Sequence, residues 1–261
     1  MPLRSLHPSL LRVLPLVLAW MTWSANTAEA ADLMTWTVDG QPRQATVYVP
    51  AAASEPAPLV LAFHGFGDEM ENFQYVGLHR AWPEAVVVYL QGLPTRERYR
   101  GWQTERGQYG DRDLKLVDTA LASLRTKYRI DESRIYATGF SNGAMFTYLL
   151  WAERPAVFAA YAPIAGRVRA SVQPAVKRPV LHVAGTRDAT VRYTDQQAAF
   201  EMAMRVNGVE AVAKACGTGC TIYGEATPAP VMVLTHDGGH TIPSGTPQRV
   251  VAFLREFRLR P

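Results

Sequence analysis

Continuous apolar runs that alternate with helical segments constrain the fold of this chain most. Most of these runs lack the polar–apolar alternation of a strand with one exposed face, and several stop at a glycine. Each therefore predicts a strand that is buried on both faces. The runs cover residues 58–65, 85–92, 134–141, 158–166, 179–185 and 231–234.

The segments between these runs have the spacing of amphipathic helices. In residues 113–128, Leu114, Val117, Leu121 and Leu124 recur close to the helical period. Helices are also predicted over residues 143–153, 193–208 and 246–260, the last with Thr246 as a cap. An earlier segment, residues 34–50, alternates in polarity around Asp39-Gly40 and predicts a β-hairpin.

Buried strands separated by such helices predict an α/β fold with a mostly parallel central sheet and helices on both faces. The chain has 261 residues, of which 48% are hydrophobic, and shows no repeat or linker. Residues 31–261 are therefore expected to form a single domain. In parallel sheets ligands bind beyond the carboxyl ends of the strands, so functional residues are expected in the loops that follow them.

One of these strand ends carries the pattern G-x-S-x-G, as Gly139-Phe140-Ser141-Asn142-Gly143. A sharp turn from strand to helix forces the serine into a strained conformation, and the positions two before and two after must then be small. The pentapeptide is common by chance, but its place between a strand and a helix predicts a nucleophile elbow with Ser141 as the nucleophile.

A serine hydroxyl needs a base at neutral pH. With this elbow, the partners follow in the order Asp or Glu, then His. Asp188 follows the strand at 179–185, and His240 follows the run at 231–234 within the loop THDGGHTIPSG. We therefore expect His240 to be the general base and Asp188 to orient it.

Other residues compete for these roles. His236 lies nearer the strand and is expected to point along it, while His182 lies within an apolar strand and is expected to be a core residue. Asp237 is only three residues before His240, and Asp195 is expected to cap a helix. His64 precedes Ser141 and is expected to hold its own loop rather than act as a base.

Two backbone amides are expected to form the oxyanion hole. One is the N–H of Asn142, which begins the helix after the elbow. The other should come from the loop after the strand at 58–65, and the amide of Phe66 is preferred.

Residues 1–30 predict a secretory signal peptide. Arg4 and Arg12 precede a short apolar stretch, and Ala28-Glu29-Ala30 resembles a cleavage site. A membrane anchor is the alternative, although the stretch is short for a bilayer. The mature chain is expected to begin at Ala31, to be exported to the periplasm or medium, and to make no membrane contact.

Export favours a small disulfide between Cys216 and Cys220, because the glycines in CGTGC allow a tight turn. Two cysteines alone do not make a metal site, and no metal or cofactor is expected. The net charge of +4 is dispersed without a basic stripe, so nucleic-acid binding has no support.

With these residues identified, the chain resembles the secreted α/β-hydrolase esterases of the poly(3-hydroxybutyrate) depolymerase and feruloyl esterase type. The resemblance begins near Met34, and the SNG-A-M elbow and the GGHT-x-P-x-G loop are its most specific pieces. It implies the α/β-hydrolase fold, a triad of Ser141, Asp188 and His240, and carboxylic esters as substrates.

The chain departs from that pattern at two places. Ala144 stands where glycine is common, and Ile242 where tryptophan is common beside the base, so Ile242 is a candidate substrate-binding residue. Trp102 is a candidate wall of the substrate cleft. No polymer-binding module is expected after Pro261, which favours soluble esters or oligomers over solid polyester.

The predicted function is that of a secreted serine esterase that hydrolyses hydroxyalkanoate oligomers, feruloyl, acetyl or similar soluble esters through an acyl-enzyme. Two alternatives stay open. A serine peptidase could use the same scaffold, and a non-catalytic binding protein could have kept the fold.

Overall fold

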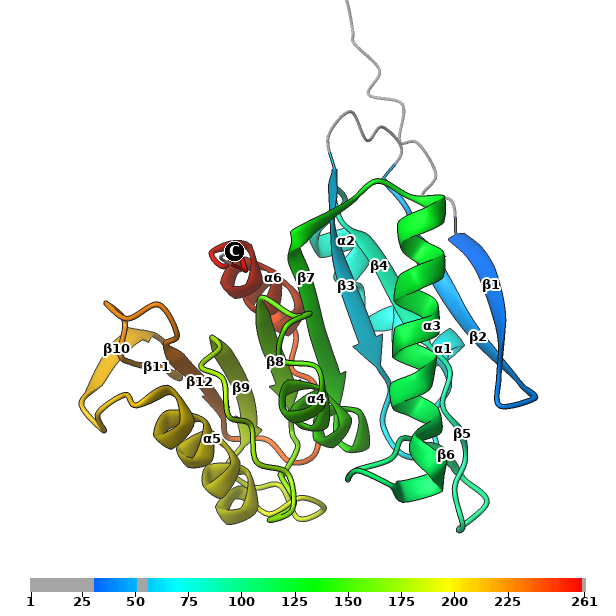
Figure 1. The fold of residues 1–261 in the computed structure, drawn as a ribbon. Coiled ribbons are helices and arrows are strands. Elements are labelled where there is room, and N and C mark those ends of the chain that lie inside the picture. The colour runs from blue at the N-terminus through cyan, green and yellow to red at the C-terminus, as the bar shows by residue number, and fades with distance from the viewer. Residues whose placement is uncertain (1–30, 51–55, 260–261) are drawn as a thin grey trace, which may run out of the picture.

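A computed structural model describes residues 31–50 and 56–259 of the chain. The predicted signal peptide at 1–30 lies outside the described residues. A ten-stranded sheet forms the centre of the molecule, and helices pack on both of its faces (Figure 1). Across the sheet the strands are β1 (Ala31–Val38), β2 (Gln41–Tyr48), β4 (Val86–Leu90), β3 (Ala57–Phe63), β7 (Ile130–Phe140), β8 (Ala160–Ile164), β9 (Val180–Gly185), β12 (Val231–His236), β11 (Cys220–Tyr223) and β10 (Ala213–Gly217).

The six central strands, from β4 to β12, run parallel to one another, and two antiparallel strands flank them at each side. This confirms the predicted mostly parallel sheet. The packing of β3 on both of its faces explains why its sequence is uniformly apolar. Leu59, Leu61 and Phe63 pack into one core cluster, whereas Val60 and Ala62 pack into the cluster on the opposite face.

The helices divide between the two faces. α3 (Arg112–Lys127), α4 (Asn142–Glu153) and α5 (Tyr193–Asn207) cover the face toward the viewer in Figure 1. α1 (Met70–Phe73), α2 (Leu78–Ala81) and α6 (Thr246–Arg255) cover the other. Short 3-10 turns at Gln74–Val76 and Gln108–Asp111 and a two-stranded ribbon of β5 (Leu93–Pro94) and β6 (Arg100–Gly101) complete the fold. Gly245, not Thr246, occupies the N-cap position of α6, because its φ of 81° suits glycine.

Two predicted local features are confirmed. The β1–β2 hairpin turns at Asp39 and Gly40, both with positive φ, as an Asp-Gly turn requires. The disulfide joins Cys216 and Cys220 across the β10–β11 hairpin, with their Cα atoms 5.0 Å apart. No helix in the described ranges is both long enough and apolar enough to cross a bilayer.

Candidate active site

Ser141 occupies the turn between β7 and α4 with φ of 55° and ψ of −113°, which is a strained conformation for a residue with a side chain. Close packing around this turn leaves no room for a side chain at Gly139 or Gly143. A Cβ atom at Gly143 would lie 2.1 Å from the carbonyl oxygen of Phe63, and one at Gly139 would lie 2.5 Å from the backbone of Gly143. The local geometry is thus that of a nucleophile elbow.

The three predicted side chains meet at this edge of the sheet. His240 Nε2 lies 2.8 Å from Ser141 Oγ, and His240 Nδ1 lies 2.7 Å from Asp188 Oδ2. Asp188 follows β9 and His240 follows β12, so parallel strands bring together residues that are far apart in the chain. An ionised carboxylate can only accept a hydrogen bond, so Nδ1 of His240 carries the proton and donates to Asp188. Nε2 is then free to accept a hydrogen bond from the hydroxyl of Ser141.

The carboxylate of Asp188 is fully buried and receives four hydrogen bonds. The backbone N–H groups of Thr190 and Val191 donate to Oδ1, at 2.8 and 2.9 Å. The side chain of Gln196 donates to Oδ2 at 3.0 Å, alongside His240. These donors hold the carboxylate in one orientation and stabilise its charge away from water.

Gln196 was not identified from the sequence. It is buried on α5, and its Nε2 also donates to the carbonyl of Val191 at 2.7 Å. Behind it lies His182, whose Nδ1 is 2.8 Å from the hydroxyl of Tyr148. Burial lowers the pKa of His182 to about 4, against a smaller opposing effect of the Gln196 side chain. The prediction that His182 is a core residue is confirmed, but the expectation that its hydrogen bonds are satisfied is only half right, because its buried Nε2 has no hydrogen-bond partner among the described residues.

The loop that carries His240 is compact. The ring of His240 packs against Phe140 with centroids 4.8 Å apart. His236 accepts the N–H of Gly238 through Nδ1 at 3.2 Å, so it shapes the loop. Asp237 points to solvent, with 98% of its side chain exposed, and pairs with Arg187. No hydrogen bond or ion pair joins Asp237 to His240.

Asp195 differs from its predicted place. It lies in the first turn of α5 rather than at the cap, and it pairs with Arg192 at 3.2 Å. The cap position belongs to Arg192 itself, which leaves Asp195 to act on the helix through its charge near the N-terminus.

His64 holds the loop that follows β3, as predicted. The N–H of Gly92 donates to its Nε2 at 2.9 Å, so the proton sits on Nδ1, which donates to the carbonyl of Gly65 at 2.7 Å. Burial lowers the pKa of His64. A Cβ atom at Gly65 would lie 3.7 Å from Ser141 Cβ, so this loop lies against the nucleophile.

The two predicted oxyanion donors belong to the two segments that adjoin Ser141, the start of α4 and the loop after β3. Asn142 is the first residue of α4, where backbone N–H groups have no partner within the helix. Phe66 follows Gly65 in the loop, and its N–H has no hydrogen-bond partner in the part of the chain that the structure describes. Their role as oxyanion donors stays a prediction.

The side chain of Asn142 makes a second contribution. Its Oδ1 accepts the N–H of Trp102 at 2.7 Å, and its Nδ2 donates to the carbonyl of Trp102 at 3.2 Å. The Trp102 indole donates to the carbonyl of His64 at 2.9 Å and stacks on Phe146. Trp102 is 1% exposed, so it fixes the segments on either side of the elbow to each other more than it offers surface to a ligand.

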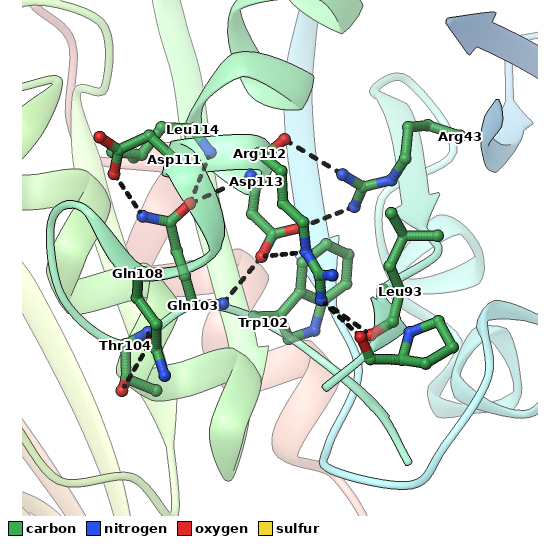
Figure 2. Close-up of polar contacts among 12 residues, drawn as sticks. Arg43, Leu93, Trp102, Gln103, Thr104, Gln108, Asp111, Arg112, Asp113 and Leu114 are labelled. Carbon is green, nitrogen blue, oxygen red and sulfur yellow. Dashed lines mark hydrogen bonds and ion pairs between the residues drawn. The ribbon is translucent and has the colours of Figure 1, made fainter. Parts of the chain in front are cut away.

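A buried ion pair supports the segment after Trp102 (Figure 2). Arg43 donates to Asp113 at 2.8 Å, and both side chains are fully buried. Asp113 also accepts the N–H of Gln103, and Gln103 accepts the N–H of Asp113 in return. Gln108 Oε1 accepts the N–H of Thr104 at 2.6 Å. The network ties the first turn of α3 to the wall beside the elbow.

A cavity of about 740 Å³ opens at Ser141. Of the predicted site residues, Ser141, Asn142, Phe66 and Trp102 line it. Ile242 does not; it is half-buried and packs against the core cluster on the far face. A substrate-binding role for Ile242 therefore has no support from its position. Among residues 31–50 and 56–259, no three metal-ligating side chains cluster.

Gly166 leaves room for the methyl group of Ala144. A Cβ atom at Gly166 would lie 2.4 Å from Ala144 Cβ, so the methyl group of Ala144 requires glycine at 166. The departure from the expected pattern thus leaves the elbow intact.

The fold has counterparts of known structure. The acetyl xylan esterase from Aspergillus awamori superposes with a TM-score of 0.67 at 16% identity, over 86% of this chain and 99% of that one. This likeness identifies the fold as that of the α/β-hydrolases.

Curated relatives are similar over parts of their length. A bifunctional acetylxylan esterase/xylanase of Neocallimastix patriciarum is 31% identical over 59% of this chain and 22% of its own. A poly(3-hydroxyalkanoate) depolymerase of Paucimonas lemoignei is 28% identical, over 62% and 40%. A feruloyl esterase of Talaromyces stipitatus is 29% identical, over 59% and 44%. The chain spans less than half the length of these three relatives.

The sequence also matches the family described as esterase PHB depolymerase over residues 44–213, which include the elbow and Asp188. Taken with the strained serine at a strand–helix turn, the fold defines an α/β-hydrolase. The chain belongs to the esterase PHB depolymerase family.

Proposed function

We propose that this protein is an exported serine esterase that hydrolyses soluble carboxylic esters through an acyl-enzyme. The observation that carries the proposal is the continuous hydrogen-bonded path from Asp188 through His240 to Ser141, with contacts of 2.7 and 2.8 Å. Family membership and relatives named acetylxylan esterase, depolymerase and feruloyl esterase support an ester as the substrate.

In the first half-reaction, Ser141 Oγ attacks the ester carbonyl while its proton moves to His240 Nε2. Asp188 stabilises the imidazolium that forms. The amides of Asn142 and Phe66 donate to the oxyanion of the tetrahedral intermediate, and the alcohol leaves with the proton from His240. Water then repeats these steps on the acyl-enzyme and releases the acid.

The polar cavity favours soluble substrates such as hydroxyalkanoate oligomers, hydroxycinnamoyl esters and acetyl esters. Residues 1–30 are proposed to direct export and to be removed, which leaves residues 31–261 as one catalytic domain. N-terminal sequencing of the exported protein should find Ala31 as the first residue.

The test compares p-nitrophenyl acetate, methyl ferulate and a peptide p-nitroanilide as substrates of the wild type and Ser141→Ala. Hydrolysis of the esters should fall by about 10⁴-fold or more in the variant, because the nucleophile is lost. Cleavage of the anilide alone would favour a peptidase. Ester hydrolysis that survives in Ser141→Ala would exclude Ser141 as the nucleophile, and no turnover of any substrate would favour a binding protein.

A further inference from the structure

The cavity at Ser141 is cationic as well as polar. Four guanidinium groups, those of Arg96, Arg167, Arg169 and Arg192, line it together with only two carboxylates. Its volume of about 740 Å³ is within the usual range of small-molecule sites, of roughly 300 to 1,000 Å³. Such walls suit a hydrophilic anion better than a long alkyl chain.

Two of the four arginines are already engaged. Arg192 pairs with Asp195, with contacts of 3.2 and 3.3 Å to its two carboxylate oxygens. Arg169 donates from Nε to the hydroxyl of Thr104 at 2.6 Å, across the cavity, and its Nη1 lies 3.9 Å from Glu105. These contacts hold the side chains as parts of the wall.

Arg167 is different. Its guanidinium group has no hydrogen-bond or ion-pair partner in the parts of the chain that the structure describes, and its side chain is exposed. Arg96 is also exposed and has no partner among the described residues, but it is followed by Glu97, a lining carboxylate that likewise has no partner there. Arg167 is therefore the better candidate for an anionic ligand.

The backbone before Arg167 lies directly against the nucleophile. The N–H of Ser141 donates to the carbonyl of Ile164 at 2.8 Å. A Cβ atom at Gly166 would lie 3.3 Å from the carbonyl oxygen of Ser141. Ala165 has a φ of 51°, which turns the chain sharply at the end of β8. The elbow thus anchors the segment that presents Arg167 to the cavity.

We propose that Arg167 binds a free carboxylate on the ester substrate, so that the enzyme selects anionic esters. The inference rests on the proposed esterase function and adds the charge of its substrate. A guanidinium group matches a carboxylate with two parallel N–H donors, and an exposed one gives up little hydration to do so. An open-chain hydroxyalkanoate oligomer carries such a group at its free acid end.

The experiment uses two pairs of esters that differ only in charge. 4-Acetoxybenzoate and 4-acetoxybenzamide place the charge on the leaving group, whereas monomethyl adipate and methyl adipamate place it on the acyl group. The readout is the ratio of kcat/KM between the anion and the neutral amide, corrected for alkaline hydrolysis of each ester. The wild type, Arg167→Gln and the control Arg249→Gln are compared.

We expect the wild type to prefer the anion in at least one pair, by about fivefold at low salt, as one exposed ion pair allows. The preference should shrink as ionic strength rises. Arg167→Gln should bring the ratio close to one, mainly through KM. Arg249 on α6 is exposed and lines another cavity, and its guanidinium group has no hydrogen-bond or ion-pair partner among the described residues, so Arg249→Gln should keep the wild-type ratio.

Other outcomes separate the two proposals. If the neutral esters are hydrolysed by a Ser141-dependent reaction but neither anion is preferred, the esterase proposal stands and the role of Arg167 is wrong. An anion preference that persists in Arg167→Gln also contradicts that role. If no ester of either pair is hydrolysed, both proposals fail together.

Discussion

Replacement of Gln196 by leucine tests whether the buried amide behind the triad positions Asp188. In the native protein, Gln196 Nε2 donates to Asp188 Oδ2 at 3.0 Å and to the carbonyl of Val191 at 2.7 Å. Leucine has a similar volume and no donor, so both acceptors lose a partner. Asp188 keeps its two backbone donors and His240.

The size of the effect follows from these contacts. A hydrogen bond to a charged group contributes about 1.5–3 kcal/mol, and a neutral one about 1 kcal/mol. Loss of both bonds should lower the free energy of unfolding by about 3 kcal/mol. Since three donors still hold the carboxylate, kcat should fall only about tenfold. KM should stay near the wild-type value, because Gln196 does not line the cavity.

Gln197→Leu is the matched control. Gln197 is the next residue on α5, but its side chain donates to Glu201 at 2.8 Å and faces away from Asp188. Steady-state kinetics with p-nitrophenyl acetate, well below the melting temperature, should separate the two variants. If Gln196→Leu loses stability but keeps the wild-type kcat, the amide is only a packing element and the positioning argument is wrong.

Three further predictions concern stability and can be checked by urea unfolding. Arg43→Met should cost about 3 kcal/mol because buried Asp113 loses its closest cation and keeps only the N–H of Gln103 and the more distant Arg112, at 3.8 Å; adding Asp113→Leu should recover much of the loss, and no recovery would contradict the reasoning. The pKa of His182 is lowered to about 4 in the folded state, so the unfolded state binds a proton first as pH falls below about 6.5. From pH 6.5 to 5 this histidine should cost about 1.6 kcal/mol of stability, a dependence that His182→Gln should remove. Loss of the Cys216–Cys220 disulfide in the double alanine variant should cost about 2 kcal/mol and leave kcat/KM unchanged, since the closed loop is short and the hairpin lies at the edge of the sheet, with three strands between it and β7; a fall in kcat/KM would show that the hairpin is coupled to the active site.

The sequence predicts those site residues whose positions follow from strand ends. Ser141, Asp188 and His240 each come directly after a strand of the parallel sheet, so the pattern of buried runs is enough to bring them to one edge. The small residues of the elbow add a steric signature that is visible in the chain itself.

The supporting residues leave no such trace. Gln196 and Gln197 are adjacent and identical, and only the rotation of α5 makes one a partner of Asp188 and the other a partner of Glu201. The place of Arg167 likewise depends on how the end of β8 turns against the elbow. β10 and most of its hairpin are exposed, so they lack the apolar run that marks the central strands.

The most direct measurement of the central claim is active-site labelling with a fluorophosphonate, followed by peptide mass mapping and a parallel activity assay. The fraction of activity lost should equal the fraction of chains that carry one phosphonyl group, and that group should be on Ser141. His240→Ala should slow the labelling sharply, because the hydroxyl then has no base. Full inactivation with the adduct on another residue, or full activity after complete modification of Ser141, would contradict the account.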